Sequence, residues 1–181
     1  MTILKNYCNQ ILKHDFLNKF NYKDINQIPN IKKIILNFNC KSFELKKITT
    51  AILTLELISA KKSYFTKSKK VSINLKLRKG HPVGCKVILE KGKLEIFLFK
   101  LLNKILPKLK NFKGLKQGVY HKNSFSFSLK DLTNFDEIKS NFYLFTNLPS
   151  LNITFVYTTN NVKELNFFIY SLKIPLVQTE S

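Results

Sequence analysis

The sequence predicts an α+β fold: a two-layer sandwich whose mainly antiparallel sheet has helices packed on one face, with a basic hairpin extension. Segments with helical spacing of apolar residues alternate along the chain with segments of strict apolar–polar alternation. The 181 residues, 44% hydrophobic and 13% aromatic, are enough to bury a substantial core. Because no proline- or serine-rich linker and no repeat divides the chain, a single domain over 1–181 is predicted.

Four segments have apolar residues at every third or fourth position, the spacing of a helix that buries one face. Proline follows two of them, at Pro107 and Pro175, where it would stop a helix. A threonine, Thr49 or Thr50, is suited to cap the start of another. Helices are therefore predicted over 3–20, from Thr49 or Thr50 to Ala60, over 93–106 and over 161–172.

Strands are predicted where β-branched and aromatic residues alternate with polar ones. These segments are 31–38, 63–79, 84–90, 124–130 and 151–158. In the lysine-rich segment 63–79, the alternation from Val71 to Leu77 predicts a half-buried strand with polar side chains on its other face. Gly-His-Pro at 80–82 predicts a turn, so this segment and 84–90 are expected to form a hairpin.

Positive charge is concentrated in the middle of the chain. The formal net charge is +20, from 31 Lys and Arg against 11 Asp and Glu. It divides into +5 for residues 1–56, +17 for 57–130 and −2 for 131–181. Such an excess on a foldable chain predicts a polyanionic partner, either nucleic acid or an anionic membrane surface. We therefore expect an RNA-facing basic part over about 1–130, and an acidic C-terminal strand and helix over about 131–176.

Lysine supplies nearly all of this charge, because Arg78 is the only arginine. Arginine bonds bases and phosphates bidentately, whereas lysine acts as a point charge, so a lysine-built protein would grip backbone phosphates more than read base sequence. The same ratio, with abundant Asn, Ile and Phe, also follows from A/T-rich coding in an organelle or an A/T-rich microbe. Both explanations stay open at this point.

The remaining motifs predict no chemistry beyond binding. Cys8, Cys40 and Cys85 form no close pair and are odd in number, so we expect reduced, buried thiols. The cysteines and histidines have no metal-ligand spacing, and we predict no metal and no cofactor. No nucleophile–base arrangement, phosphate-binding glycine loop or spaced carboxylate pair predicts a catalytic residue. No apolar run is long enough for a membrane span, and we expect no leader at the N-terminus.

Several strings match one family in order and nearly in register. The strongest are Thr-Lys-Ser-Lys-Lys at 66–70, Lys-Gly-His-Pro-Val-Gly-Cys-Lys-Val at 79–87 and Leu-Pro-Lys-Leu-Lys-Asn-Phe-Lys-Gly-Leu at 106–115. Weaker ones are Phe-Asn-Tyr at 20–22, Ile-Pro at 28–29 and Leu-Asn-Ile-Thr-Phe-Val at 151–156. Over roughly 4–176 the chain resembles the bacterial-type large-subunit ribosomal protein five family, which binds 5S rRNA in the central protuberance.

Three positions depart from the family pattern. Tyr-His-Lys-Asn at 120–123 replaces a loop that bears glycine and arginine, so we expect that loop's contacts to differ. Ala-Lys-Lys at 60–62 stands where the family commonly has Gly-Gln-Lys, and Ile88 where a threonine is usual. The last two positions lie near 5S rRNA in the family, so an altered or reduced interface with that RNA is expected.

The resemblance implies a structural constituent of the large ribosomal subunit and not an enzyme. The expected partners are 5S rRNA if it is retained, large-subunit rRNA, the tRNA in the peptidyl site and neighbouring central-protuberance proteins. Across an intersubunit bridge, small-subunit head protein thirteen is expected. The composition favours a mitochondrial ribosome in the matrix; a plastid, or the cytoplasm of an A/T-rich bacterium, is the alternative location.

Cations that no acid offsets are the strongest candidates for RNA binding, because phosphates attract clustered positive charge. Residues 61–79 contain many cations and no acid. With polar residues near the first helix and first strand, the candidate RNA-binding set is Asn21, Tyr22, Asn37, Lys61, Lys62, Lys67, Lys69, Lys70, Lys76, Arg78, Lys79 and His81. The structural alternatives are a solvated surface run, and a turn-capping role for Asn37.

The resemblance also places the loop near 110–115 and the segment after 124–130 at a subunit bridge. The candidate residues there are Lys110, Lys113, Asp131, Asp136 and Glu137. Acidic side chains would suit a basic protein partner and would repel RNA. Solubilising surface charge is the alternative explanation for the acids.

Two other functions compete with the ribosomal one. A standalone basic RNA-processing or tRNA-modifying enzyme would need a cofactor or acid–base motif, and the sequence contains none that we recognise. A membrane-surface protein would need an amphipathic helix with a lysine face. The densest lysine run falls instead on a predicted strand and loop, so we predict no membrane partner.

Overall fold

The structure is a computed structural model, and it describes residues 6–22, 24–40, 44–74, 77–109, 114, 119–121, 123–145, 147–159 and 161–175. The chain divides into two compact units. Unit 1 comprises residues 1–34, 90–127 and 154–181, and unit 2 comprises residues 35–89 and 128–153. Each unit is described by itself.

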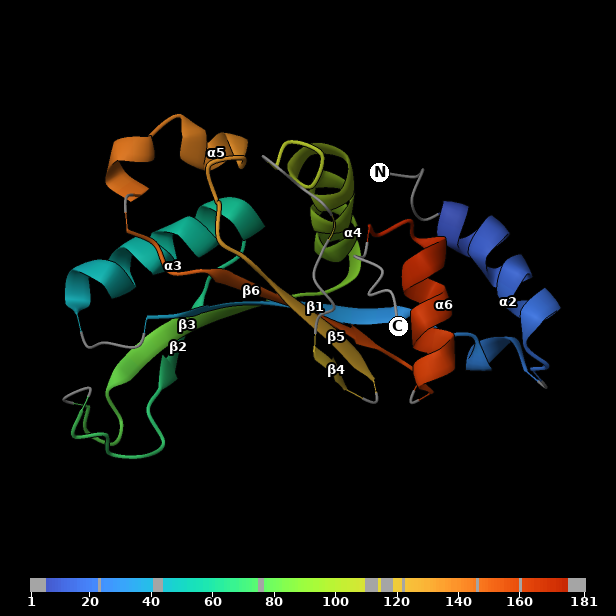
Figure 1. Cartoon of the computed structure of the whole chain (residues 1–181), viewed down its shortest axis with the longest axis horizontal. Coiled ribbons are helices and arrows are strands. Elements are labelled where there is room, and N and C mark those ends of the chain that lie inside the picture. The colour runs from blue at the N-terminus through green and yellow to red at the C-terminus, as the bar shows by residue number, and fades with distance from the viewer. Residues whose placement is uncertain are drawn as a thin grey trace. The chain divides into compact units, whose positions relative to one another are not determined.

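The described residues form a six-stranded sheet in the order β2-β3-β1-β6-β5-β4 (Figure 1). The strands are β1 (Ile31–Asn39), β2 (Tyr64–Lys67), β3 (Pro82–Leu89), β4 (Val119–His121), β5 (Ser124–Leu129) and β6 (Leu151–Tyr157). β2 pairs antiparallel with β3, and β4 with β5. Asn123 bonds to Tyr157 and Ser126 to Thr154, so β5 and β6 also run in opposite directions. An antiparallel sheet with helices packed on it confirms the predicted α+β class.

Unit 1 has a core of helices and aromatic rings. Its helices are a π-helical segment (Tyr7–Leu12) that continues as α2 (Lys13–Lys19), α4 (Lys91–Lys100) with a π-helical continuation (Leu101–Ile105), and α6 (Val162–Ser171). Phe16 is fully buried and packs edge-on against Phe167, with ring centroids 4.9 Å apart. The described residues thus confirm the helices predicted over 3–20, 93–106 and 161–172.

In unit 2, α3 (Leu45–Ser59) packs on β3. It buries Ile48, Ala51, Leu55 and Ile58, whose spacing of three or four residues puts them on one helix face. A short helix, α5 (Asp136–Lys139), and a 3-10 turn (Phe142–Phe145) pack against α3. Unit 2 is therefore built in layers, with α3 between the strands and the α5 segment.

The predicted start of α3 is wrong. The helix begins at Leu45, and Thr49 and Thr50 lie within it. Each hydroxyl donates to a carbonyl of the preceding turn, with Thr49 Oγ1 3.0 Å from Leu45 O and Thr50 Oγ1 3.0 Å from Lys46 O. A threonine can satisfy its hydroxyl in this way inside a helix as well as at its start, so the residue type alone did not locate the cap. The predicted end is correct, because Ala60 adopts a left-handed conformation there.

The long strand predicted over 63–79 is also wrong. Only Tyr64–Lys67 pairs as β2, and beyond it the described residues form a single bridge, between Ser72 and Leu77. Ile73 is 88% exposed, whereas Leu77 is 5% exposed, so the alternation does not produce one buried face. The ladder shifts register after Thr66 and ends opposite Pro82, which has no backbone N–H to donate.

Candidate nucleic-acid interface

The basic loop, residues 67–81, joins β2 to β3 in unit 2. Backbone hydrogen bonds fix its base: Ser68 N donates to His81 O at 2.8 Å, and Gly80 N donates to Ser68 O at 3.0 Å. Gly80 has a φ of 90°, a conformation that side-chain-bearing residues rarely adopt. This confirms the predicted turn at 80–82 and explains its glycine.

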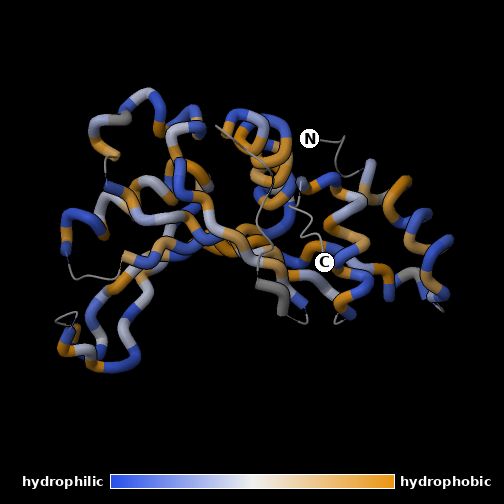
Figure 2. Tube along the Cα trace, viewed as in Figure 1, coloured by the Kyte–Doolittle hydropathy of each residue, from blue (hydrophilic) through white to orange (hydrophobic). Residues whose placement is uncertain are grey.

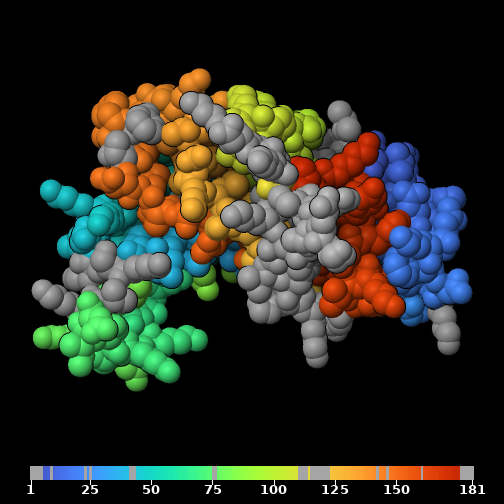
Figure 3. Space-filling model, in the orientation of Figure 1, coloured from blue at the N-terminus to red at the C-terminus, as the bar shows by residue number. Residues whose placement is uncertain are grey.

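Five cations of this loop are exposed: Lys67, Lys69, Lys70, Arg78 and Lys79. No acid occurs in the sequence between Glu56 and Glu90, and none of the five makes an ion pair within the described part of the chain. The green atoms of the loop stand out from α3 in Figure 3, and Figure 2 shows that apolar residues are interspersed with the hydrophilic ones. Lys76, a further predicted cation, lies outside the described residues. The loop therefore presents positive charge that no neighbouring acid offsets.

Three other predicted RNA-binding residues flank this loop with different environments. Lys62 is exposed, whereas Lys61 is half-buried and its Nζ donates to Ile88 O at 2.7 Å. That bond ties the end of α3 to β3, which gives Lys61 a structural role. His81 is half-buried in the turn, where its carbonyl accepts the bond from Ser68.

The open face is the side of the unit 2 strands opposite their buried residues. On β1, Leu36 and Phe38 are fully buried, while Asn37 between them is half-buried. On β3, Cys85 and Val87 are fully buried, while Lys86 between them is exposed. Since successive strand residues point to opposite faces, Asn37 and Lys86 both lie on the open face.

Tyr64 extends the open face onto β2. It pairs directly with Lys86 in the antiparallel ladder, and directly paired residues share a face. The Tyr64 side chain is 55% exposed. The strands approach closely here, because a Cβ on Gly84 would clash with the carbonyl oxygen of Phe38. Tyr64, Lys86 and Asn37 thus form a row of polar and aromatic groups across three strands.

Sequence reasoning missed Tyr64 and Lys86 as members of this surface. The alternation of Lys86 with Cys85 and Val87 was the signal that would have found it. Tyr64 carried no such signal, because the predicted strand 63–79 extended too far and its facing was assigned from Val71 onward.

Asn21 and Tyr22, also predicted to bind RNA, belong to unit 1. Asn21 is exposed and Tyr22 is half-buried. Burial, together with the neighbouring Glu164 carboxylate, raises the pKa of Tyr22 to about 12. Glu164 also accepts bonds from Thr159 at 2.5 Å and Asn161 at 3.3 Å, at the start of α6. Tyr22 is therefore neutral at physiological pH and adjoins the polar network that begins α6.

The acidic candidates for a subunit bridge lie in unit 2. Asp131 and Asp136 are exposed, and Glu137 is half-buried beside Asp136 in the first turn of α5. They surround the buried side chains of Phe135 and Ile138. Lys110 and Lys113, the other predicted bridge residues, lie outside the described residues.

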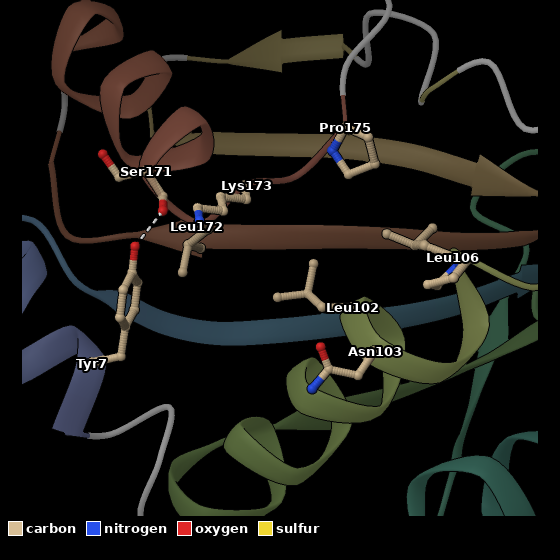
Figure 4. Close-up of a pocket in the computed structure, with 9 residues that line it drawn as sticks. Tyr7, Leu102, Asn103, Leu106, Ser171, Leu172, Lys173 and Pro175 are labelled. Carbon is tan, nitrogen blue, oxygen red and sulfur yellow. Dashed lines mark hydrogen bonds between the residues drawn. The ribbon is translucent and has the colours of Figure 1, made fainter.

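Unit 1 contains a cavity of about 470 Å³ between α6 and the continuation of α4 (Figure 4). Its walls are mainly apolar, with Leu102 and Leu106 facing Pro175. Tyr7 closes one end, where its hydroxyl donates to Ser171 O at 2.9 Å. No pair of acidic and basic side chains converges among the described residues that line it, so the cavity lacks the groups for acid–base chemistry.

The cysteines are not poised for nucleophilic chemistry. Burial raises the pKa of Cys8 and Cys40, and it raises the pKa of Cys85 to about 12. The thiolate is the reactive form, so these thiols are inert at neutral pH. In the part of the chain that the structure describes, no cluster of His, Cys, Asp or Glu could hold a metal ion. Nor does any helix of that part have the length and apolar character to span a bilayer.

Similarity to known proteins covers nearly the whole chain. A family model, which describes the C-terminus of the ribosomal uL5 family, matches residues 82–176. Large ribosomal subunit protein uL5m of Reclinomonas americana is 36% identical over 179 residues, which are 97% of this chain and 98% of that protein. Protein uL5 of Nitrosomonas europaea is 33% identical over 178 residues, 97% of this chain and 98% of that protein. Protein uL5 of Wigglesworthia glossinidia brevipalpis is 44% identical over 125 residues, 67% of this chain and 70% of that protein.

These relatives are all proteins of the large ribosomal subunit. They confirm the resemblance stated from the sequence and reject the standalone RNA-processing or tRNA-modifying enzyme. The chain belongs to the ribosomal uL5 family and is a structural, non-enzymatic protein of the large ribosomal subunit.

Proposed function

We propose that this protein binds rRNA in the central protuberance of a mitochondrial large ribosomal subunit, contacting 5S rRNA where that RNA is retained and large-subunit rRNA beside it. The observation that carries the proposal is the basic loop, whose five exposed cations have no acid near them in the sequence. Lysines that meet phosphates displace condensed counterions, and this release drives binding. An isolated surface would hold such a cluster only against its own repulsion.

The open face supports RNA as the partner. It adjoins the basic loop in unit 2 and carries Lys86, Tyr64 and Asn37, which offer a charge, a ring and an amide. In the family that the sequence resembles, this sheet faces 5S rRNA. The proposed division is that the loop grips backbone phosphates and the open face contacts nucleotides.

The basic loop is also proposed to reach the tRNA in the peptidyl site. The sequence resemblance assigns the segment around 66–82 to the tRNA elbow. Exposed lysines in a loop held by few buried side chains can adjust to a tRNA that moves during translation. Backbone phosphates are the same at every elbow, so point charges suit a contact that must accept all tRNAs.

Across the subunit boundary, Asp131, Asp136 and Glu137 are proposed to contact small-subunit head protein thirteen, which is basic. They belong to the net-acidic part of the chain. A salt-screened contact between exposed charges is weak and reversible, which suits a bridge that shifts as the small-subunit head moves.

A mitochondrial location is supported by two observations. One relative, from Reclinomonas americana, is named uL5m, and the chain has 31 Lys and Arg of which only Arg78 is arginine. The experiment is sucrose-gradient sedimentation of a mitochondrial lysate, with the protein followed by antibody. We expect it to migrate with the large ribosomal particle and to leave that particle after RNase digestion. A free pool at the top of the gradient, or migration with plastid or cytoplasmic ribosomes alone, would contradict the proposal.

A further inference from the structure

We propose that Tyr64, Lys86 and Asn37 form a subsite on the open face that holds one unpaired RNA nucleotide, with its base stacked on the Tyr64 ring. This inference rests on the proposed rRNA binding and names the RNA element that the open face takes. It assigns stacking to a residue for which phosphate neutralisation gives no role.

The Tyr64 ring is available for stacking. It lies on β2, at one end of the strand order that the described residues form, and 55% of the side chain is exposed. The ladder holds its backbone opposite Lys86, so the ring stands on a rigid strand and not on a loop. Every base has a π-face, and an aromatic ring fixed on a sheet is a standard platform for one.

The charge around Tyr64 favours a polyanion over an acidic protein or a neutral surface. Lys86 is directly opposite, and Lys62 and Lys67 are exposed on either side along the chain. A phosphate attached to a stacked nucleotide would lie within reach of such cations. An acidic peptide would pair with the lysines but would make no use of the flat ring between them.

Asn37 adds a group that matches a base edge. It lies on the same face as Lys86, and β1 neighbours β3 in the sheet. Its Oδ1 is buried and has no hydrogen-bond partner among the described residues. A buried polar atom without a partner is costly, so a ligand that supplies the bond is favoured. An asparagine amide has both a donor and an acceptor, as base edges do.

The geometry selects an unpaired nucleotide rather than a helix. Inside an RNA helix each base is covered on both faces by its neighbours, and the deep major groove does not admit side chains. A base can lie flat on Tyr64 only if it is splayed out of a loop or bulge. We therefore expect single-stranded RNA to depend on Tyr64 and duplex RNA to be indifferent to it.

The test measures filter binding of the full chain to two probes, a short oligoadenylate and a blunt RNA hairpin. Tyr64→Leu should weaken oligoadenylate binding about tenfold or more and leave hairpin binding unchanged. Tyr64→Phe, which keeps the ring, should bind like the wild type. Phe65→Leu is the matched control, because Phe65 is 57% exposed on the same strand but pairs with buried Cys85, on the other face. It should change neither affinity.

Separate outcomes overturn the stacking inference and the proposed function. Equal losses for Tyr64→Leu and Phe65→Leu, equal losses on both probes, or no loss at all would refute stacking while leaving RNA binding intact. A wild-type protein that binds neither probe would refute RNA binding itself. Binding of the wild type to anionic vesicles, lost in Tyr64→Leu while both RNA affinities persist, would reassign the open face to a membrane.

Discussion

The basic loop and the α5 segment, residues 131–145, belong to the same unit but use their side chains in opposite ways. Among the described residues of the loop only Leu77 is buried, while five cations are exposed. The α5 segment instead buries several apolar side chains beneath exposed acids; they are Leu132, Phe135, Ile138 and Phe145. The comparison separates two ways to present charge: on a loop held by backbone bonds, and on a segment anchored in a core.

This difference has consequences for mutation. Exposed lysines contribute little to the free energy of unfolding, so changes in the loop should alter binding and spare the fold. Apolar residues of the α5 segment pack in the layer with α3, so their loss should alter the fold itself. The acids of that segment combine both features, since they are exposed on an anchored element.

The largest effect is expected from Phe135→Ala. Phe135 is fully buried, and its carbonyl accepts bonds from Ile138 and Lys139 that begin α5. Removing the ring should lower the free energy of unfolding by about 3–5 kcal/mol, measured by urea denaturation. Ile73→Ala, at an apolar residue of the loop that is 88% exposed, should change it by less than about 0.5 kcal/mol. A comparable loss at both positions would show that the loop also contributes to the core.

Periodicity predicted the elements of the core correctly. Strand 124–130 alternates strictly in sequence, and in the structure Phe125 and Phe127 lie beside Phe155, with ring centroids 6.5 and 5.8 Å away. The spacing of Leu94, Phe97 and Leu98 likewise predicted a helix that buries them. In these segments burial is the dominant energy, and burial is what the pattern encodes.

The same reasoning failed where no neighbour exists to bury a face. Val71 and Ile73 alternate with polar residues, yet both are exposed because the ladder has already ended at Pro82. The open face was only half predicted, since Asn37 was a candidate and its neighbours Tyr64 and Lys86 were not. Their grouping depends on the register between strands distant in sequence, which local spacing does not contain.

The next effect concerns RNA affinity. Neutralising Lys67, Lys69 and Lys70 together, each to alanine, should remove about three phosphate contacts. The slope of log affinity against log salt for large-subunit rRNA should then become shallower by about 2 to 3, because each contact contributes about 0.7 to 0.9. Wild-type affinity should fall steeply with salt in the same filter-binding titration. Urea denaturation of the variant should match the wild type, since all three side chains are exposed.

A matched control removes the same charge elsewhere. Lys139, Lys163 and Lys173 are the lysines of the net-acidic part of the chain, and all three are exposed. Their replacement by alanine should leave the salt slope nearly unchanged. Equal changes in the two triple variants would mean that net charge, and not the basic loop, determines the affinity. A nearly flat salt dependence of the wild type would remove the phosphate contacts altogether.

The smallest effect is expected at the acids of the α5 segment. Asp136→Lys with Glu137→Lys should weaken joining of the two ribosomal subunits a few-fold, about 3- to 10-fold at low salt, by turning attraction to a basic partner into repulsion. Asp136→Asn with Glu137→Gln should give a smaller loss, and high salt should diminish both. The measurement is light scattering of purified subunits, with rRNA binding of the same variants as the control. Neither double variant should weaken rRNA binding, because these acids belong to the segment that we assign to a protein. Unchanged joining together with weaker rRNA binding would mean that the acidic side chains serve RNA, and the two segments of unit 2 would then share one partner.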